Sequence, residues 1–182
     1  MKLTTILFFS IFFLFAFNGY GQTTLINEDL RSGSLPSGWS DTNVDFTTAA
    51  GGYAKFSSTT AVLTTPTFDA SANASIDVDF SVAKFGTGGN GPLTIEYSLD
   101  GGSSWTTQGN STTPTSSTYQ SNTISISTTS TNMHVRFTRA SSPSQKRLRD
   151  VVIEGIGSSG GGSCSITDLG LANIACDDNG TG

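Results

Sequence analysis

The chain has 182 residues, a formal net charge of −5 and 13% charged residues, which is about half of the usual ~25%. A net negative charge disfavours binding to nucleic acids or to anionic membrane surfaces, because both recruit clusters of lysine and arginine. The length that remains after removal of a short leader suffices for one domain with its own hydrophobic core.

Residues 1–21 have the features of a secretory signal peptide. Lys2 is followed by an apolar run from Ile6 to Phe17 and then by small residues around Gly21. The run is too short to span a bilayer and no later stretch approaches ~20 apolar residues, so we expect no membrane insertion. We expect cleavage after Gly21 and export of the mature chain to the cell surface or the extracellular space.

Residues 22–156 are dominated by a two-residue alternation of apolar and polar side chains. Ile76, Val78, Phe80 and Val82 alternate with aspartate and serine. Similar patterns lie at 93–97, 124–126, 133–137 and 148–153, and weaker strand signals lie at 24–28, 43–48, 52–58, 61–67 and 104–108. Such strands bury one face and expose the other, which is typical of antiparallel sheets. The pattern predicts an all-β fold, namely a two-sheet antiparallel β-sandwich (jelly roll) with about eight to ten strands.

A turn motif stands out between the strands predicted at 92–98 and 104–108. The stretch "YSLDGGSSWTT" at 97–107 fits S-x-D-x-G-x-[ST]-W, and this pattern resembles the Asp-box turn of many secreted β-proteins. Asp100 can accept hydrogen bonds from its own turn, and Gly102 tolerates a positive φ. Trp105 can lie over the hairpin. We predict that these three residues form a structural turn. Binding of a cation or a sugar by Asp100, and contact of the Trp105 ring with a sugar, are the alternatives.

Motifs that would support catalysis are weak. Residues 86–91 formally match G-x-G-x-x-G, but a strand pattern follows where a phosphate site needs a helix, so we expect a hairpin loop. Asp77 and Asp79 share the polar face of one strand, yet nothing predicts the dry pocket that would raise a carboxyl pKa. We therefore predict that the protein is not an enzyme.

Sugar binding requires exposed aromatic rings or polar side chains on an open face. Tyr119 ends a loop rich in serine and threonine, and His134 and Arg136 alternate with apolar residues, so both face outward. We single out Tyr119, His134 and Arg136 as candidate ligand contacts. Packing against the domain, or plain exposure to solvent, is the alternative for each of them.

The composition changes after Ile156. Residues 157–163, "GSSGGGS", predict a flexible linker. Residues 164–182 begin a second module, but they are too few to bury a core. We expect this module to be truncated at residue 182 and further domains of the same polypeptide to follow.

Several stretches resemble one group of domains. These stretches are "INEDLRSGSLPSGWS" at 26–40, "LTTPTFDAS" at 63–71, "LTIEYSLDGGSSWTT" at 93–107 and "RLRDVVIEG" at 147–155. Together they resemble secreted adhesin-like jelly-roll modules of the MAM, cleaved-adhesin and choice-of-anchor type, found in Gram-negative bacteria with type IX secretion. The resemblance implies a jelly roll that serves attachment, carbohydrate binding or display beside a secreted hydrolase.

The same resemblance implies one structural Ca²⁺ between the first and the last strand. Carried over to this sequence, its ligands would be Glu28 and Asp150, because calcium prefers carboxylate oxygens. Arg149 departs from the pattern, since it stands where a second aspartate is expected. Its guanidinium would repel Ca²⁺ or pair with Asp150 instead.

The segment from residue 164 resembles the repeat modules that follow such domains. In an exported chain, its two cysteines, Cys164 and Cys176, suggest a disulfide between them. Closing this loop would stabilise the segment by ~3 kcal/mol.

The function that these observations favour is a non-catalytic secreted adhesion or carbohydrate-binding module, with glycans or extracellular surface proteins as partners. Two alternatives stay open. The domain is an accessory part of a larger secreted protease, nuclease or glycosidase whose catalytic part lies beyond residue 182, or it is a structural spacer.

Overall fold

The computed structural model describes residues 21–88, 90–139 and 145–157. Except for Gly21 and Gly157, the predicted signal peptide (1–21) and linker (157–163) lie outside the described residues, as do the second module (164–182) and the pairing of Cys164 with Cys176. In the part of the chain that is described, no helix has both the length and the apolar character needed to cross a membrane.

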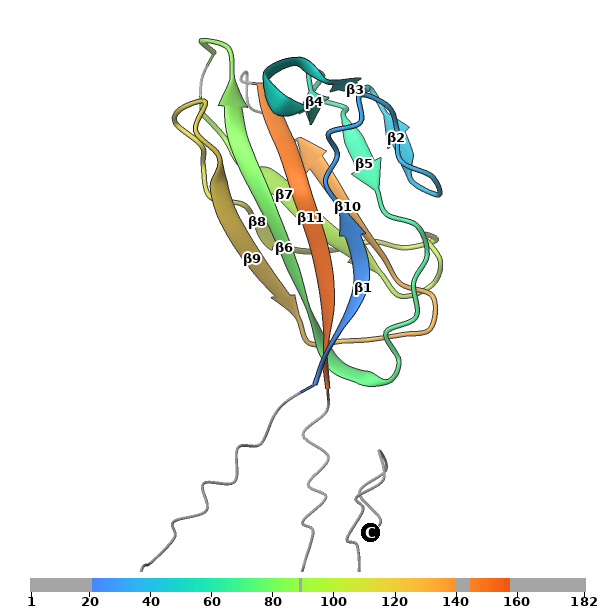
Figure 1. Ribbon diagram of the computed structural model, residues 1–182. Helices are drawn as coiled ribbons and strands as arrows, with labels where there is room; N and C mark the ends of the chain where they lie inside the picture. Colours follow the sequence, from blue (N-terminus) through green and yellow to red (C-terminus); the bar gives the residue numbers. More distant parts are fainter. Residues whose placement is uncertain (1–20, 89, 140–144, 158–182) are drawn as a thin grey trace, which may run out of the picture.

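Two antiparallel sheets form the domain (Figure 1). The six-stranded sheet has the order β3-β4-β11-β6-β9, and β1 also pairs with β11. Its strands are β1 (Gln22–Glu28), β3 (Val44–Thr47), β4 (Tyr53–Phe56), β6 (Asn73–Phe85), β9 (Gln120–Ile126) and β11 (Gln145–Gly157). The five-stranded sheet has the order β2-β5-β10-β7-β8. Its strands are β2 (Ser40–Thr42), β5 (Val62–Thr64), β7 (Leu93–Ser98), β8 (Thr106–Asn110) and β10 (His134–Arg139).

Strand β11 organises the six-stranded sheet. It pairs with β6 along its length, with β4 near its start and with β1 over its second half. A bulge between Arg149 and Val152 places Asp150 at a φ of +56°. Gly21 accepts a backbone hydrogen bond from Gly157, so the described chain enters and leaves the domain at the same end, the lower one in Figure 1.

The core lies between the two sheets. Alternate residues of β6 face inward, where Ile76, Val78 and Val82 are fully buried. Phe80 of β6 meets Phe137 of β10 in an edge-to-face contact with ring centroids 5.2 Å apart, which joins the sheets. The alternation in the sequence thus corresponds to one buried and one solvated face of each sheet.

The end of the core at which β11 begins carries cations. Lys146 is fully buried and Arg139 is nearly so. Lys146 and Lys84 are paired positions on β11 and β6. Burial, with the charges of Arg139 and Lys84, lowers the pKa of Lys146 to about 8.

The predicted fold class is confirmed: the described residues form an all-β sandwich of two antiparallel sheets. The described residues contain eleven strands, against about eight to ten predicted. The additional strand is β2, which has only three residues and no alternation in its sequence. Strand β7 and not a helix follows the glycine-rich stretch at 86–91. Residues 49–51 form one short 3-10 turn.

Candidate functional site

The Asp100 turn is held together by its own side chains. The Asp100 carboxylate accepts hydrogen bonds from the Ser98 hydroxyl at 2.7 Å and from the Ser104 amide and hydroxyl at 2.9 and 2.6 Å. These bonds, led by those from Ser104, lower the pKa of Asp100 to about 2. Gly102 has a φ of +91°, and its carbonyl accepts a hydrogen bond from the Trp105 indole at 3.1 Å. The carboxylate oxygens are thus committed to shaping the β7–β8 hairpin.

The indole of Trp105 also belongs to a second group, on the outer face of the five-stranded sheet. The Arg136 guanidinium lies over the Trp105 ring at 4.1 Å from its centroid, and Arg136 Nε bonds to Glu96 at 2.8 Å. The His134 ring lies 6.4 Å from the Trp105 ring. We call Trp105, His134, Arg136 and Glu96 the Trp105 surface. The structure therefore brings together two of the three predicted ligand contacts.

Hydrogen bonds to the segment that follows β5 fix the imidazole of His134. Its Nδ1 donates to the Thr65 carbonyl and its Nε2 accepts from the Thr67 hydroxyl, each at 2.9 Å. Both ring nitrogens are therefore engaged. His134 lies at the edge of the Trp105 surface. With both nitrogens bonded, only the face of its imidazole ring remains available to a ligand.

Tyr119 lies on the opposite side of the sandwich. It precedes β9, and the Arg149 guanidinium of β11 stacks on its ring at 3.6 Å from the centroid. Its buried hydroxyl has no hydrogen-bond partner among the described residues. Burial raises the pKa of the phenol, although the charges of Arg149 and Arg147 oppose the shift. Tyr119 therefore cannot share one ligand site with His134 and Arg136.

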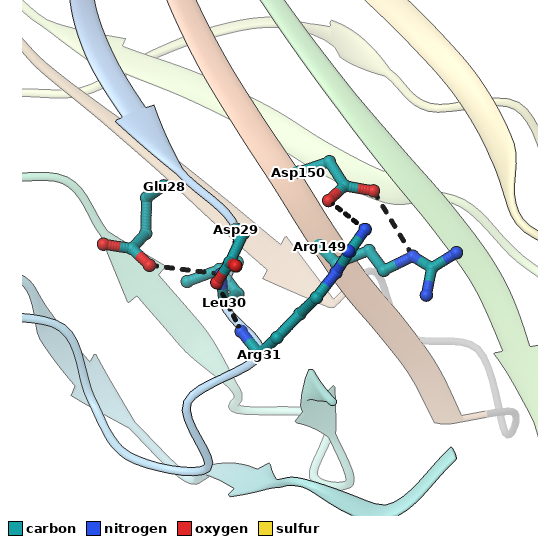
Figure 2. Close-up of polar contacts among 6 residues, drawn as sticks. All are labelled: Glu28, Asp29, Leu30, Arg31, Arg149 and Asp150. Carbon is teal, nitrogen blue, oxygen red and sulfur yellow. Dashed lines mark hydrogen bonds and ion pairs between the residues drawn. The ribbon is translucent and has the colours of Figure 1, made fainter. Parts of the chain in front are cut away.

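The two residues that the resemblance offers to calcium lie near the junction of β1 and β11 (Figure 2). Asp150 binds Arg31 with one carboxylate oxygen at 2.5 Å and lies 3.3 Å from Arg149 Nε with the other. Glu28 instead accepts the amide of Leu30 at 3.2 Å. The backbone completes the junction, because the Asp150 amide donates to the Asp29 carbonyl.

These residues do not fit a bound calcium ion. Ca²⁺ takes six to eight oxygen ligands, whereas both oxygens of Asp150 already face guanidinium groups. Across the described ranges, no group of three or more histidine, cysteine, aspartate or glutamate residues gathers where a metal could bind. The Arg149–Asp150 pairing that the sequence offered in place of calcium is present. Arg31 is a second cation there, and no pattern in the sequence predicts its pairing with Asp150.

Asp77 and Asp79, the carboxylate pair considered for catalysis, lie apart from the Trp105 surface and from the junction of β1 and β11. Asp77 and Asp79 accept hydrogen bonds from the Ser125 and Thr123 hydroxyls of β9, on the outer face of the six-stranded sheet. Serine and threonine partners of this kind solvate a sheet face. They do not create the dry environment that a general acid requires.

No protein-family model matches the chain, and no curated protein matches its sequence. Similar solved structures include the CBM22-1 xylan-binding domain from Paenibacillus barcinonensis, with a TM-score of 0.60, 10% identity and coverage of 77% of this chain and 99% of that one. A cleaved adhesin domain of Lys-gingipain from Porphyromonas gingivalis has a TM-score of 0.58 and 17% identity, covering 74% and 99%. A CBM35 from Paenibacillus barcinonensis has a TM-score of 0.52 and 15% identity, covering 70% and 97%. The domain thus has the jelly-roll fold shared by carbohydrate-binding modules and cleaved adhesin domains.

Proposed function

We propose that this domain is a secreted, non-catalytic carbohydrate-binding or adhesion module whose sugar contact is the Trp105 surface. The observation that carries the proposal is the stacking of the Trp105 indole on Arg136, with Glu96 and His134 beside them. This group lies on a solvated sheet face built from alternate residues of β7 and β10.

The chemistry of the group suits a sugar ring. A pyranose presents C–H groups on its faces, which pack on an indole, and hydroxyls around its edge, which need donors and acceptors. Arg136 supplies only donors and Glu96 only acceptors. Because the two side chains already bind each other, their geometry is fixed before a ligand arrives, which limits the entropy lost on binding.

The structural neighbours support the proposal through the fold alone. One is a xylan-binding domain and another is an adhesin domain, and both are covered almost entirely by this chain. A fold hosts many functions, so the argument for sugar binding rests on the Trp105 surface and not on the likeness.

The test is a polysaccharide panel probed with the full chain and three variants. Trp105→Ala and Glu96→Gln should each lower the affinity for the polysaccharide that the wild type binds. For Trp105→Ala the loss should be at least about tenfold, or ~1.4 kcal/mol. Ser125→Ala removes a hydroxyl from the opposite sheet and should bind as the wild type does. Thermal melting of each variant separates lost binding from lost folding. Absence of any retained glycan, or equal affinity of a folded Trp105→Ala, would refute the proposal.

A further inference from the structure

Cations and aromatic rings alternate on the outer face of the six-stranded sheet, at the end where β6 finishes and β11 begins. We call six residues on β4, β6, β11 and the start of β9 the cation–aromatic patch: Tyr53, Lys55, Phe85, Tyr119, Arg147 and Arg149. They belong to the upper end of the sandwich in Figure 1, away from the end at which the described chain enters and leaves.

The contacts inside the patch place the cations over the rings. The Arg147 guanidinium carbon lies 4.8 Å from the ring centroids of both Tyr53 and Phe85. Lys55 Nζ lies 5.3 Å from the Phe85 centroid, and Arg149 stacks on Tyr119 as described above. A guanidinium stacked in this way keeps its charge and its planar set of donors, and the stacking restricts its rotamers.

The patch has a surplus of positive charge. Lys55 pairs with Asp45 at 3.1 Å, and Arg149 shares Asp150 with Arg31. Within the described ranges, no carboxylate lies within ion-pair distance of Arg147, and its Nε is buried without a hydrogen-bond partner. A chain with a net charge of −5 therefore displays a local excess of cations.

The other cations reinforce this asymmetry. Lys84 and Lys146 are partners on β6 and β11, and the charges of Arg139 and Lys84 reach Lys146. Arg139 belongs to this end although it lies on β10 of the five-stranded sheet, whereas Arg136, on the same strand, lies on the outer face beside Trp105. Lys146 is buried and faces the core, so the argument for recognition rests on the cations of the outer face. Charges that serve only solubility would be interspersed in sign, whereas an unbalanced group of cations indicates a function in recognition.

We propose that the cation–aromatic patch is a second ligand surface, which binds acidic polysaccharides through Arg147. A carboxylate or sulfate group accepts two parallel hydrogen bonds from a guanidinium, and the sugar that carries it can pack on the neighbouring rings. The ligand class rests on the proposed function, because it is the aromatic setting within a carbohydrate-binding module that favours a glycan over an acidic peptide. The surface itself is independent of Trp105.

The experiment compares two charge-matched variants, one on each face, in the full chain. Arg147→Gln and Arg136→Gln each remove one positive charge. Binding is measured by calorimetry with oligogalacturonate, dextran sulfate, uncharged xylo-oligosaccharide and oligo-glutamate. We expect Arg147→Gln to lower the affinity for the acidic oligosaccharide by at least about tenfold, or ~1.4 kcal/mol. Arg136→Gln should leave this affinity unchanged. Affinity should also fall as sodium chloride screens the contact.

The design separates the two proposals. Loss of the acidic ligand only in Arg136→Gln or Trp105→Ala would overturn the patch and leave the Trp105 surface in place. Oligo-glutamate binding as tight as oligogalacturonate would overturn the glycan assignment. Comparison of oligogalacturonate with dextran sulfate identifies which anionic group is preferred. Lys55→Gln, at a partly exposed position, gives a second variant should Arg147→Gln fail to fold. Unchanged affinity in every variant of the patch that folds would refute the proposal.

Discussion

Lys146 offers a test of the packing at the cationic end of the core. The side chain is fully buried and faces inward on the same side of β11 as Leu148. Its pKa falls from 10.5 to about 8, chiefly through burial and further through the charges of Arg139 and Lys84. At ~1.4 kcal/mol per pKa unit, this shift corresponds to about 3 kcal/mol between its two protonation states.

The sign of the pH dependence follows from the lowered pKa. Between pH 8 and 10.5 the unfolded chain binds more protons at Lys146 than the folded chain does, so the free energy of unfolding rises with pH. The expected rise between pH 7 and pH 9.5 is about 2 kcal/mol. The raised pKa of Tyr119 acts only above pH 10 and in the opposite direction, so it does not contribute in this window.

The measurement is urea unfolding at both pH values, followed by tryptophan fluorescence, because Trp39 is buried in the core. Lys146→Met keeps the length of the side chain and removes its charge. This variant should lose the pH-dependent rise and be more stable than the wild type at pH 7. Lys55→Met removes a half-exposed amine and should keep the rise. A wild-type stability that stays flat from pH 7 to 9.5, or a Lys146→Met variant that retains the rise, would show that the reasoning is wrong.

Four further predictions address the core, the turn and the strand junction. Phe137→Ala removes the edge-to-face partner of Phe80 and should lower the free energy of unfolding by about 3–5 kcal/mol in denaturant titrations. Asp100→Ala should lower the melting temperature at neutral pH, and the deficit should shrink as pH falls from 3.8 towards 2, where the wild-type carboxylate is protonated; a constant deficit would contradict this. Arg31→Ala breaks a half-exposed ion pair with Asp150 and should cost only about 0.2–1 kcal/mol. EDTA and added calcium should leave the wild-type melting temperature unchanged, and a shift with calcium would show that a metal displaces the arginines.

The sequence predicts the buried faces of the strands because alternation reports burial directly. Ile76 and Val78 lie inward as expected. The alternation breaks between Leu148 and Val151, both of which are buried although they are three residues apart. Only the bulge at Asp150 reconciles these positions. This break in the period is a signal in the sequence, whereas the partner that Asp150 finds in Arg31 is not, because 119 positions separate the two residues.

The burial of residues at strand ends is harder to predict from the sequence. A lysine at the start of a strand is usually solvated, yet Lys146 is fully buried. Its spacing of two residues from Leu148 places it on the inward face, so alternation outweighs charge here. For Tyr119 no periodicity was available, because it follows a loop, and only the pairing of β9 with β6 assigns it to the six-stranded sheet.

The two outer faces of the sandwich therefore differ in chemistry although both are solvated. On the outer face of the five-stranded sheet, the guanidinium of Arg136 is neutralised by Glu96 and lies over the Trp105 ring. On the six-stranded sheet, Arg147 is held between rings with no such neutralisation in the described part of the chain. A balanced pair beside an indole suits uncharged hydroxyls, whereas an unbalanced guanidinium attracts anions from a distance. If both surfaces bind, salt should weaken the second and spare the first.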